Sequence, residues 1–276
     1  MGGIDRITEG RTQRSSEMKK IRKDRADNSE FSGVWLQKAL DFGSNSSYST
    51  ADVIYAGDTG ASPRGLSLKF AGKYKNTFNN RSKKFMTLGN LIHSQWKDYL
   101  SKAKILIADE QRVNTSLFDF SLRGRIDFLI NHEGEKEIIE LKTTGLSNWS
   151  SLVEPDPFHL AQLVTYMWLL ELDHGYVVYV DRDSLDFKSF PVKKKDGDIT
   201  LYDVHGVMHK HIPGYIDDMI ERWHFAVWCA RNNYLPNQKC EECIKWGCNQ
   251  QCDELEKSMK VISREEWKKL NEHSNS

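Results

Sequence analysis

The sequence lacks several features that would assign a protein to a class at once. It has 39 Lys and Arg against 39 Asp and Glu, so the formal net charge is zero and neither favours nor excludes a nucleic-acid partner. It contains no apolar run close to the roughly 20 residues that a membrane-spanning helix needs. Its first residues are glycine-rich and charged without an apolar core, and we therefore expect no secretory signal.

Cysteine is also scarce, with five residues in the chain, but it is unevenly distributed. Four cysteines fall within one short segment, namely Cys240, Cys243, Cys248 and Cys252. In an intracellular chain, closely spaced cysteines are more typical of metal ligands than of disulfides. We predict a metal site there; Zn²⁺ and a [4Fe-4S] cluster both take four thiolates, and both remain open.

The composition that is present supports a folded domain. Hydrophobic residues make up 39% of the chain and aromatic residues 11%, which is enough to build a core. We predict a flexible basic arm over residues 1–30, because residues 11–25 hold seven Lys and Arg against two acids. A main domain over 31–235 and a cysteine-rich metal-binding segment with a terminal helix over 236–276 are expected to follow.

Hydrophobic periodicity predicts an α/β fold with a mixed central sheet flanked by helices. The spacing is helical over 88–100, 157–172 and 213–232. Strand-like patterns occupy 105–113, 117–130, 137–142, 176–180 and 187–192. Near the C-terminus, Ser263 and Glu266 have the spacing of a capping box, which predicts a short final helix.

The segment between Thr59 and Lys97 has eight Lys and Arg and no acidic residue, with aromatic residues interleaved. Basic side chains neutralise phosphates and aromatic rings stack on bases, so this segment is a candidate DNA-binding surface. A preference for single-stranded DNA or free ends would follow. Alternatively, the aromatic residues belong to the core and the basic ones are merely solvated. The candidate phosphate contacts are Lys73, Lys75, Lys83 and Lys84.

Two neighbouring strand-like segments carry the residues with the clearest chemistry. Asp127 lies on the first, and Glu140 and Lys142 are two apart on the second, so these two share a face of their strand. If the strands pair, two carboxylates and an ammonium converge. Carboxylates are ligands for Mg²⁺, and a nearby lysine can orient an attacking water. The alternative is an exposed network of salt bridges.

Four motifs in this order resemble the PD-(D/E)xK nuclease superfamily, and more closely its RecB-like branch. That branch includes CRISPR-associated adaptation nucleases and many phage exonucleases. The motifs are Gly89-Asn90-Leu91-Ile92-His93, Gly124-Arg125-Ile126-Asp127, Glu140-Leu141-Lys142-Thr143 and Gln162-Leu163-Val164-Thr165-Tyr166. The resemblance implies a restriction-endonuclease-like core.

The resemblance also implies roles for individual residues. His93, Asp127 and Glu140, with the backbone carbonyl of Ile139, would bind Mg²⁺ or Mn²⁺. The catalytic group would comprise Asp127, Glu140, Lys142, Gln162 and Tyr166. The chain departs from the branch at its cysteines, because cluster-bearing members place one cysteine before the core and none precedes it here. That departure weakens the iron–sulfur interpretation and favours Zn²⁺.

The resemblance implies a metal-dependent deoxyribonuclease, an exonuclease or a DNA-end-processing enzyme, in the cytoplasm of a prokaryotic or phage-infected cell. Two other functions remain open. One is a non-catalytic nucleic-acid-binding protein that uses the nuclease fold as a scaffold. The other is a subunit of a recombination or adaptation complex.

Overall fold

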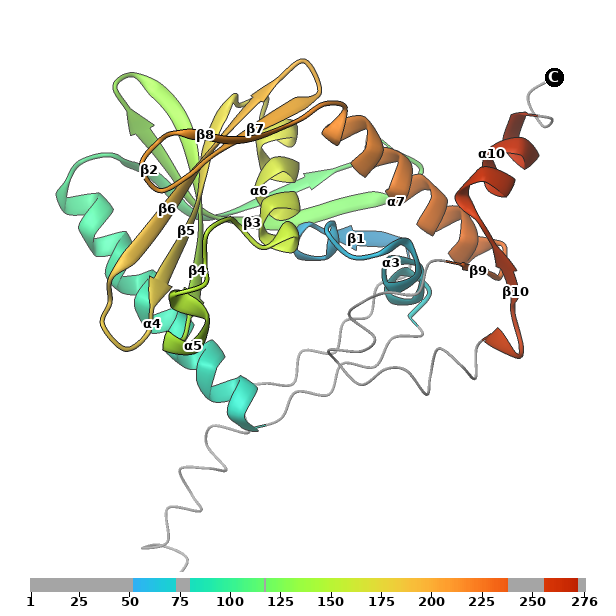
Figure 1. Cartoon of the computed structure of the whole chain (residues 1–276), viewed down its shortest axis with the longest axis horizontal. Helices are drawn as coiled ribbons and strands as arrows, with labels where there is room; N and C mark the ends of the chain where they lie inside the picture. Colours follow the sequence, from blue (N-terminus) through green and yellow to red (C-terminus); the bar gives the residue numbers. More distant parts are fainter. Residues whose placement is uncertain (1–51, 73–79, 117, 238–255, 273–276) are drawn as a thin grey trace, which may run out of the picture. The chain divides into compact units, whose positions relative to one another are not determined.

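The computed structural model describes residues 52–72, 80–116, 118–237 and 256–272 (Figure 1). The chain divides into two compact units: Met1–Ser47 with Phe78–Thr87, and Tyr48–Thr77 with Leu88–Ser276. The described part of the first unit is a helical stretch from Asn80 to Thr87. The second unit contains the sheet and the remaining elements.

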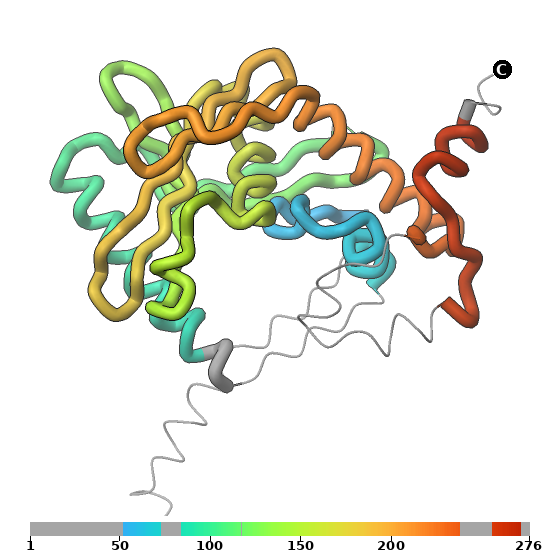
Figure 2. The backbone as a smooth tube through the Cα atoms, in the orientation of Figure 1, coloured from blue at the N-terminus to red at the C-terminus, as the bar shows by residue number. Residues whose placement is uncertain are grey.

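Runs of helices and runs of strands follow one another along the chain, as Figure 1 shows, and Figure 2 traces the backbone in the same orientation. The helices are η1 (Ala56–Asp58), α3 (Pro63–Phe70), α4 (Asn80–Lys102), α5 (Leu146–Trp149), α6 (Pro157–Leu169), α7 (Tyr215–Arg231) and α10 (Arg264–Glu272). The strands are β1 (Val53–Tyr55), β2 (Leu106–Thr115), β3 (Ser121–His132), β4 (Glu135–Thr144), β5 (His174–Asp181), β6 (Phe187–Lys195), β7 (Asp198–Tyr202), β8 (Met208–Ile212), β9 (Tyr234–Pro236) and β10 (Lys260–Ile262).

The main sheet has eight strands in the order β1-β3-β4-β5-β6-β7-β8, with β2 paired to β3 as well. The β1–β3 and β4–β5 pairs are parallel and the other pairs are antiparallel. The prediction of an α/β fold with a mixed central sheet is therefore confirmed. A small parallel pair, β9 with β10, lies outside this sheet.

The central strands are buried on both faces, and successive residues of β4 serve two different cores. Ile138 belongs to the larger core, where α3, α6 and α7 contribute Leu66, Leu163 and Trp223. The next residue, Ile139, belongs to a smaller core on the opposite face. There the α4 side chains Ile92 and Leu100 pack against β3, β4 and β5, among other contacts (Figure 1). The α4 and α6 helices therefore cover opposite faces of β4.

Local sequence signals define several element ends. Asp156 caps α6 by accepting a hydrogen bond from the backbone N–H of Phe158 at 2.9 Å, and Pro157 occupies the first helical position. The capping box of α10 is present, because Ser263 Oγ accepts from the N–H of Glu266 at 3.1 Å and the Glu266 carboxylate accepts from the N–H of Ser263 at 2.7 Å.

One strand prediction is wrong at its start. The strand expected over 117–130 begins at Ser121, and Phe118 and Phe120 instead stack on each other with ring centroids 4.9 Å apart. Phe118 also stacks on Trp168 of α6 at 5.7 Å. Their alternation with polar residues imitates a strand, but packing against helices determines their conformation.

Two predicted regions lie outside the described residues: the basic arm over 1–30 and the cysteine segment over 240–252. The domain boundaries at 31, 235 and 236 stay predictions. Within the described ranges, no helix combines the length and apolar character needed to cross a membrane.

Candidate active site

The candidate site lies where β3 and β4 separate. Their ladder runs from the pair His132 and Glu135 to the pair Phe128 and Ile139, and ends there. Beyond this point β4 continues beside β5, whereas β3 continues beside β2 and β1. We call this divergence the fork. Asp127 and Glu140 are the first residues beyond the last pair, so the fork brings the G-x-x-D and E-x-K motifs together.

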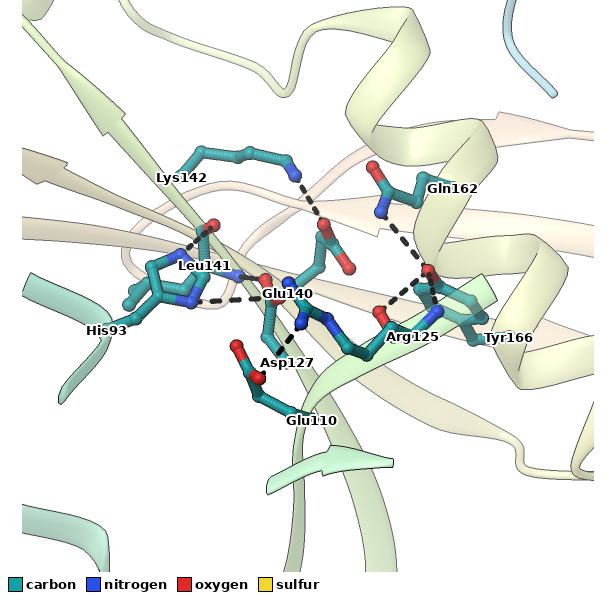
Figure 3. Close-up of polar contacts among 9 residues, drawn as sticks. All are labelled: His93, Glu110, Arg125, Asp127, Glu140, Leu141, Lys142, Gln162 and Tyr166. Carbon is teal, nitrogen blue, oxygen red and sulfur yellow. Dashed lines mark hydrogen bonds and ion pairs between the residues drawn. The ribbon is translucent and has the colours of Figure 1, made fainter. Parts of the chain in front are cut away.

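Backbone groups of β3 that β4 no longer satisfies are taken up by the Q-x-x-x-Y helix. The Tyr166 hydroxyl accepts a hydrogen bond from the N–H of Arg125 at 3.1 Å and donates to its carbonyl oxygen at 2.9 Å (Figure 3). Gln162 Nε2 donates to the same hydroxyl at 3.3 Å. Tyr166 is almost fully buried, and burial raises its pKa. It is therefore a neutral hydrogen-bonding group that positions β3.

The glycine of the G-x-x-D motif is required by this contact. A Cβ atom at Gly124 would lie 2.5 Å from the Tyr166 ring and 2.8 Å from the Cβ atom of Ala56. Such distances are far inside van der Waals contact, so only glycine lets the tyrosine approach the strand. The two motifs therefore pack against each other, although they are distant in sequence.

Asp127 and His93 form the outer side of the site (Figure 3). Asp127 Oδ2 accepts a hydrogen bond from the backbone N–H of Leu141 at 2.9 Å. The Nδ1 atom of His93 lies 3.7 Å from Asp127 Oδ1, and its Nε2 atom lies 3.1 Å from the carbonyl oxygen of Leu141. The histidine of α4 therefore does reach the acidic strands, as the motif order predicts.

Glu140 and Lys142 form the inner side. Glu140 is 0% exposed, and its Oε1 atom accepts from Lys142 Nζ at 2.5 Å. Burial raises the pKa of Glu140 to about 8, because it outweighs the opposing effect of Lys142; the neighbouring Asp127 raises it further. Burial alone would lower the pKa of Lys142, but Glu140 and Asp127 outweigh burial and raise it. Lys142 is therefore an ammonium at neutral pH.

The donor atoms at the fork fit a hard divalent cation. Glu140 Oε2 is buried and has no hydrogen-bond partner, which is costly unless another ligand takes it up. The Asp127 carboxylate is partly exposed beside it. Among the described residues, no three His, Cys, Asp or Glu side chains are already grouped as a metal site. Two carboxylates suit Mg²⁺, which keeps several of its waters.

Two backbone carbonyls near the site differ in their surroundings. Ile139, expected as a ligand, is paired with Phe128 in the β3–β4 ladder and is buried. Leu141 lies beyond the ladder on the β3 side, and its carbonyl oxygen faces His93. The carbonyl of Leu141 is the one directed into the fork.

None of the four candidate phosphate contacts lies in the described part of the compact unit that holds the fork. Lys73 and Lys75 lie outside the described residues, as does the side chain of Lys83. Lys84 is exposed on α4 in the first compact unit. Glu110, on the strand beside Asp127, is half-exposed and forms an ion pair with Arg125 at 3.0 Å.

The sequence analysis missed a polar pair next to Lys142. Tyr179 is the β5 residue in register with Lys142, and it is buried. Its hydroxyl accepts from the N–H of Asp156 at 2.9 Å and lies 2.8 Å from His159 Nδ1. The signal was present, because His159 precedes Gln162 by three residues and so shares its helix face.

Comparison with known proteins identifies the family. The family profile of the PD-(D/E)XK nuclease superfamily matches residues 66–253. The chain therefore belongs to the PD-(D/E)XK nuclease superfamily, as the motifs predict.

Individual relatives are distant. A CRISPR-associated exonuclease Cas4 from Saccharolobus solfataricus is 26% identical over 102 residues, which are 36% of this chain and 48% of that protein. The match thus spans about half of the relative's length. The crystal structure of SSO0001 is similar in fold, with a TM-score of 0.52 and 16% identity over 79% of this chain and 94% of that one. An alkaline exonuclease from Laribacter hongkongensis has a TM-score of 0.47 and 10% identity, covering 67% of this chain and 90% of that one.

Proposed function

We propose that the protein is a metal-dependent deoxyribonuclease that acts as an exonuclease or processes DNA ends. The observation that carries the proposal is the fork, where Asp127, Glu140 and Lys142 converge although the two strands no longer pair. A buried carboxylate with an unpartnered oxygen beside an ammonium is costly for stability alone. The superfamily match and the relative named as an exonuclease support the same function.

Asp127 and Glu140 would hold Mg²⁺ or Mn²⁺, assisted by His93 and a backbone carbonyl. Of the two carbonyls, that of Leu141 is favoured over that of Ile139, because it faces His93 beyond the ladder. A bound divalent cation would polarise the phosphate and lower the pKa of a water molecule. The hydrogen bond from the N–H of Leu141 fixes the orientation of Asp127 for this task.

Lys142 has a role that follows from its charge. Because the adjacent carboxylates keep it protonated, it acts as a hydrogen-bond donor and a positive charge. It would orient the attacking water and attract a phosphate oxygen. Gln162 and Tyr166 would contribute by holding β3 in place through Arg125.

The cysteine segment would hold a second, structural metal, with Cys240, Cys243, Cys248 and Cys252 as ligands to Zn²⁺ or a [4Fe-4S] cluster. The described residues that flank the segment support this proposal. Arg64 is buried and donates to the carbonyl oxygens of Pro236 at 2.7 Å and Asn237 at 3.3 Å. It also forms an ion pair with Glu256 at 2.5 Å.

Both flanks of the cysteine segment are thus fixed to one side chain, and the β9–β10 pair joins them again. A closed loop with four thiols orders at a small entropy cost when a metal binds. Metal analysis and the visible spectrum distinguish the two metals. Colourless protein with one zinc per chain indicates Zn²⁺. Brown protein indicates an iron–sulfur cluster, because charge transfer from sulfur to iron absorbs near 400 nm.

The nuclease proposal is tested by digesting end-labelled linear DNA and covalently closed circular DNA with Mg²⁺, Mn²⁺ or EDTA. We expect linear DNA to be degraded with either metal, and no degradation in EDTA. Closed circles should survive if the enzyme needs an end. DNA binding without cleavage under every metal condition would favour the non-catalytic scaffold instead.

A further inference from the structure

Among the described residues, one corner of the sheet is covered on a single face. In β3, Leu122 and Ile126 point into the larger core, so Arg123 and Arg125, which alternate with them, point to the other face. On that outer face Arg123 and Arg125 are exposed. The α4 helix covers this face of the sheet only from Phe128 onward, where the smaller core begins.

The strands on either side extend this outer face. Arg112 of β2 lies directly opposite Arg125, and Asn114 lies opposite Arg123. On the other side, Tyr55 of β1 is in register with Arg123. Directly opposite residues in a sheet share a face, so three arginines, an asparagine and a tyrosine form one continuous surface. We call Arg112, Arg123 and Arg125 the arginine face.

The charges of the arginine face are incompletely balanced. Arg125 pairs with Glu110, but neither Arg112 nor Arg123 has a hydrogen-bond or ion-pair partner among the described residues. Like charges placed directly opposite on a sheet are destabilising, and Arg112 faces Arg125 in this way. A bound polyanion would relieve that repulsion.

The arginine face runs along β3 toward Asp127, one residue of the candidate active site. Arg125 and Asp127 are on the same strand, two residues apart, and Arg123 is two residues further away. At about 3.3 Å per residue, Arg123 lies roughly 13 Å from Asp127 along β3. That reach corresponds to a few nucleotides of a DNA backbone. Arginine is well suited to phosphate because its planar guanidinium forms paired hydrogen bonds.

We propose that the arginine face binds the sugar–phosphate backbone of the DNA substrate a few nucleotides from the phosphate that is cleaved. The inference rests on the proposed nuclease function and names the surface along which the substrate reaches the fork. Arg112 and Arg123 supply the phosphate contacts, and Tyr55 lies beside Arg123, where its ring can contact a sugar or a base.

The competing explanation is protection of a sheet edge. β2 pairs only with β3 among the described strands, and charged side chains on an edge strand discourage association with other chains. That explanation predicts that loss of the arginines changes solubility and leaves DNA affinity intact.

The test is the full-length variant Arg112→Gln/Arg123→Gln. Arg125 is left in place because its backbone positions the fork. The matched control is Lys193→Gln/Lys195→Gln, which removes the same charge from exposed positions on β6. Lys193 is in register with His174 at the start of β5, whereas Lys142 is in register with Tyr179. A charge-conserving variant, Arg112→Lys/Arg123→Lys, completes the set.

Affinity for labelled DNA is measured across salt concentrations with Ca²⁺ replacing the catalytic metal, and cleavage is measured separately with Mg²⁺. We expect the Gln variant to bind about tenfold more weakly or worse, and the slope of log affinity against log salt to fall by roughly 1.4 for single strands or 1.8 for duplex. KM should rise and kcat at saturating DNA should be unchanged. The Lys variant should keep the wild-type slope.

Wild-type affinity and salt slope in the Gln variant would overturn the inference, provided that the wild-type protein cleaves DNA. An equal loss in the β6 control would overturn it too, because total charge would then explain the effect. If the wild-type protein neither binds nor cleaves DNA, the proposed nuclease function itself is wrong, and the inference falls with it.

Discussion

The two halves of the β3–β4 pair show how one pair of strands can serve stability and chemistry separately. In the paired half, Ile130, Ile138 and Ile139 are buried and the ladder satisfies the backbone. In the forked half, the ladder is absent and side chains replace it, with Tyr166 bound to Arg125 and Asp127 bound to the N–H of Leu141. The comparison teaches that side chains can satisfy backbone positions that a sheet leaves unpaired, and the candidate active site lies at such positions.

The largest expected effect is a loss of cleavage activity when residues of the forked half are replaced. Asp127→Asn, Glu140→Gln and Lys142→Ala should each reduce the cleavage rate by several orders of magnitude, because each removes a group that we propose binds the cation or orients water. Rates are measured in single turnover with saturating metal, and folding is checked by circular dichroism. Wild-type cleavage by the Lys142→Ala protein would show that the active site lies elsewhere.

In the paired half the expected effect is on stability. Ile138 is 0% exposed, and Ile138→Ala should lower the free energy of unfolding by about 2–5 kcal/mol through lost burial and a cavity. Urea denaturation measures this loss. The cleavage rate per folded molecule should remain close to that of the wild type. A rate that drops as far as in the Glu140→Gln protein would mean that the two halves are not separable.

An intermediate case is Gly124, which lies in the forked half and packs against Tyr166. Gly124→Ala should lower the free energy of unfolding by about 1–3 kcal/mol, because the new methyl group overlaps the Tyr166 ring. It should also slow cleavage, since Tyr166 would move and release Arg125. The double variant Gly124→Ala/Tyr166→Leu tests the cause. Gly124→Ala should lower the free energy of unfolding less in the Tyr166→Leu background than in the wild type. An equal loss in both backgrounds would contradict a clash with the Tyr166 ring.

The smallest expected effect is a pH dependence of stability in metal-free protein. The pKa of Glu140 is about 8 in the folded state and near 4.5 when unfolded, so its contribution to stability is present below pH 4.5 and is lost as pH rises through 8. Between pH 6 and 7, the free energy of unfolding should fall by at most about 1.4 kcal/mol more in the wild type than in the Glu140→Gln protein. Thermal unfolding in EDTA measures this difference. Parallel pH profiles would show that Glu140 ionises normally.

Much of the fold follows from patterns that are local in sequence. The α4, α6 and α7 helices and strands β2 to β6 were predicted from periodicity, although their ends shift by several residues. The capping box at Ser263 and Glu266 was also readable, because its hydrogen bonds join residues three apart. By contrast, β1 pairs with β3 across a long stretch of chain, and its three residues carry no pattern of their own.

The candidate site was partly predictable for the same reason. Glu140 and Lys142 are two apart on one strand, so their shared face follows from the sequence alone. The function of Tyr166 did not follow. Its partner is the backbone of Arg125, and only the departure of β4 leaves that backbone available.

The sequence by itself determined the motifs, the residue types that we propose bind a divalent cation, and the superfamily to which the chain belongs. Those properties depend on spacing along one strand or one helix, which the backbone geometry fixes. Only the tertiary structure decided where the β3–β4 ladder ends, that Glu140 is fully buried, and that Arg112 faces Arg125 at exposed positions of the sheet. These properties depend on the register between strands and on which faces the helices cover, and both are set by the packing of the whole unit.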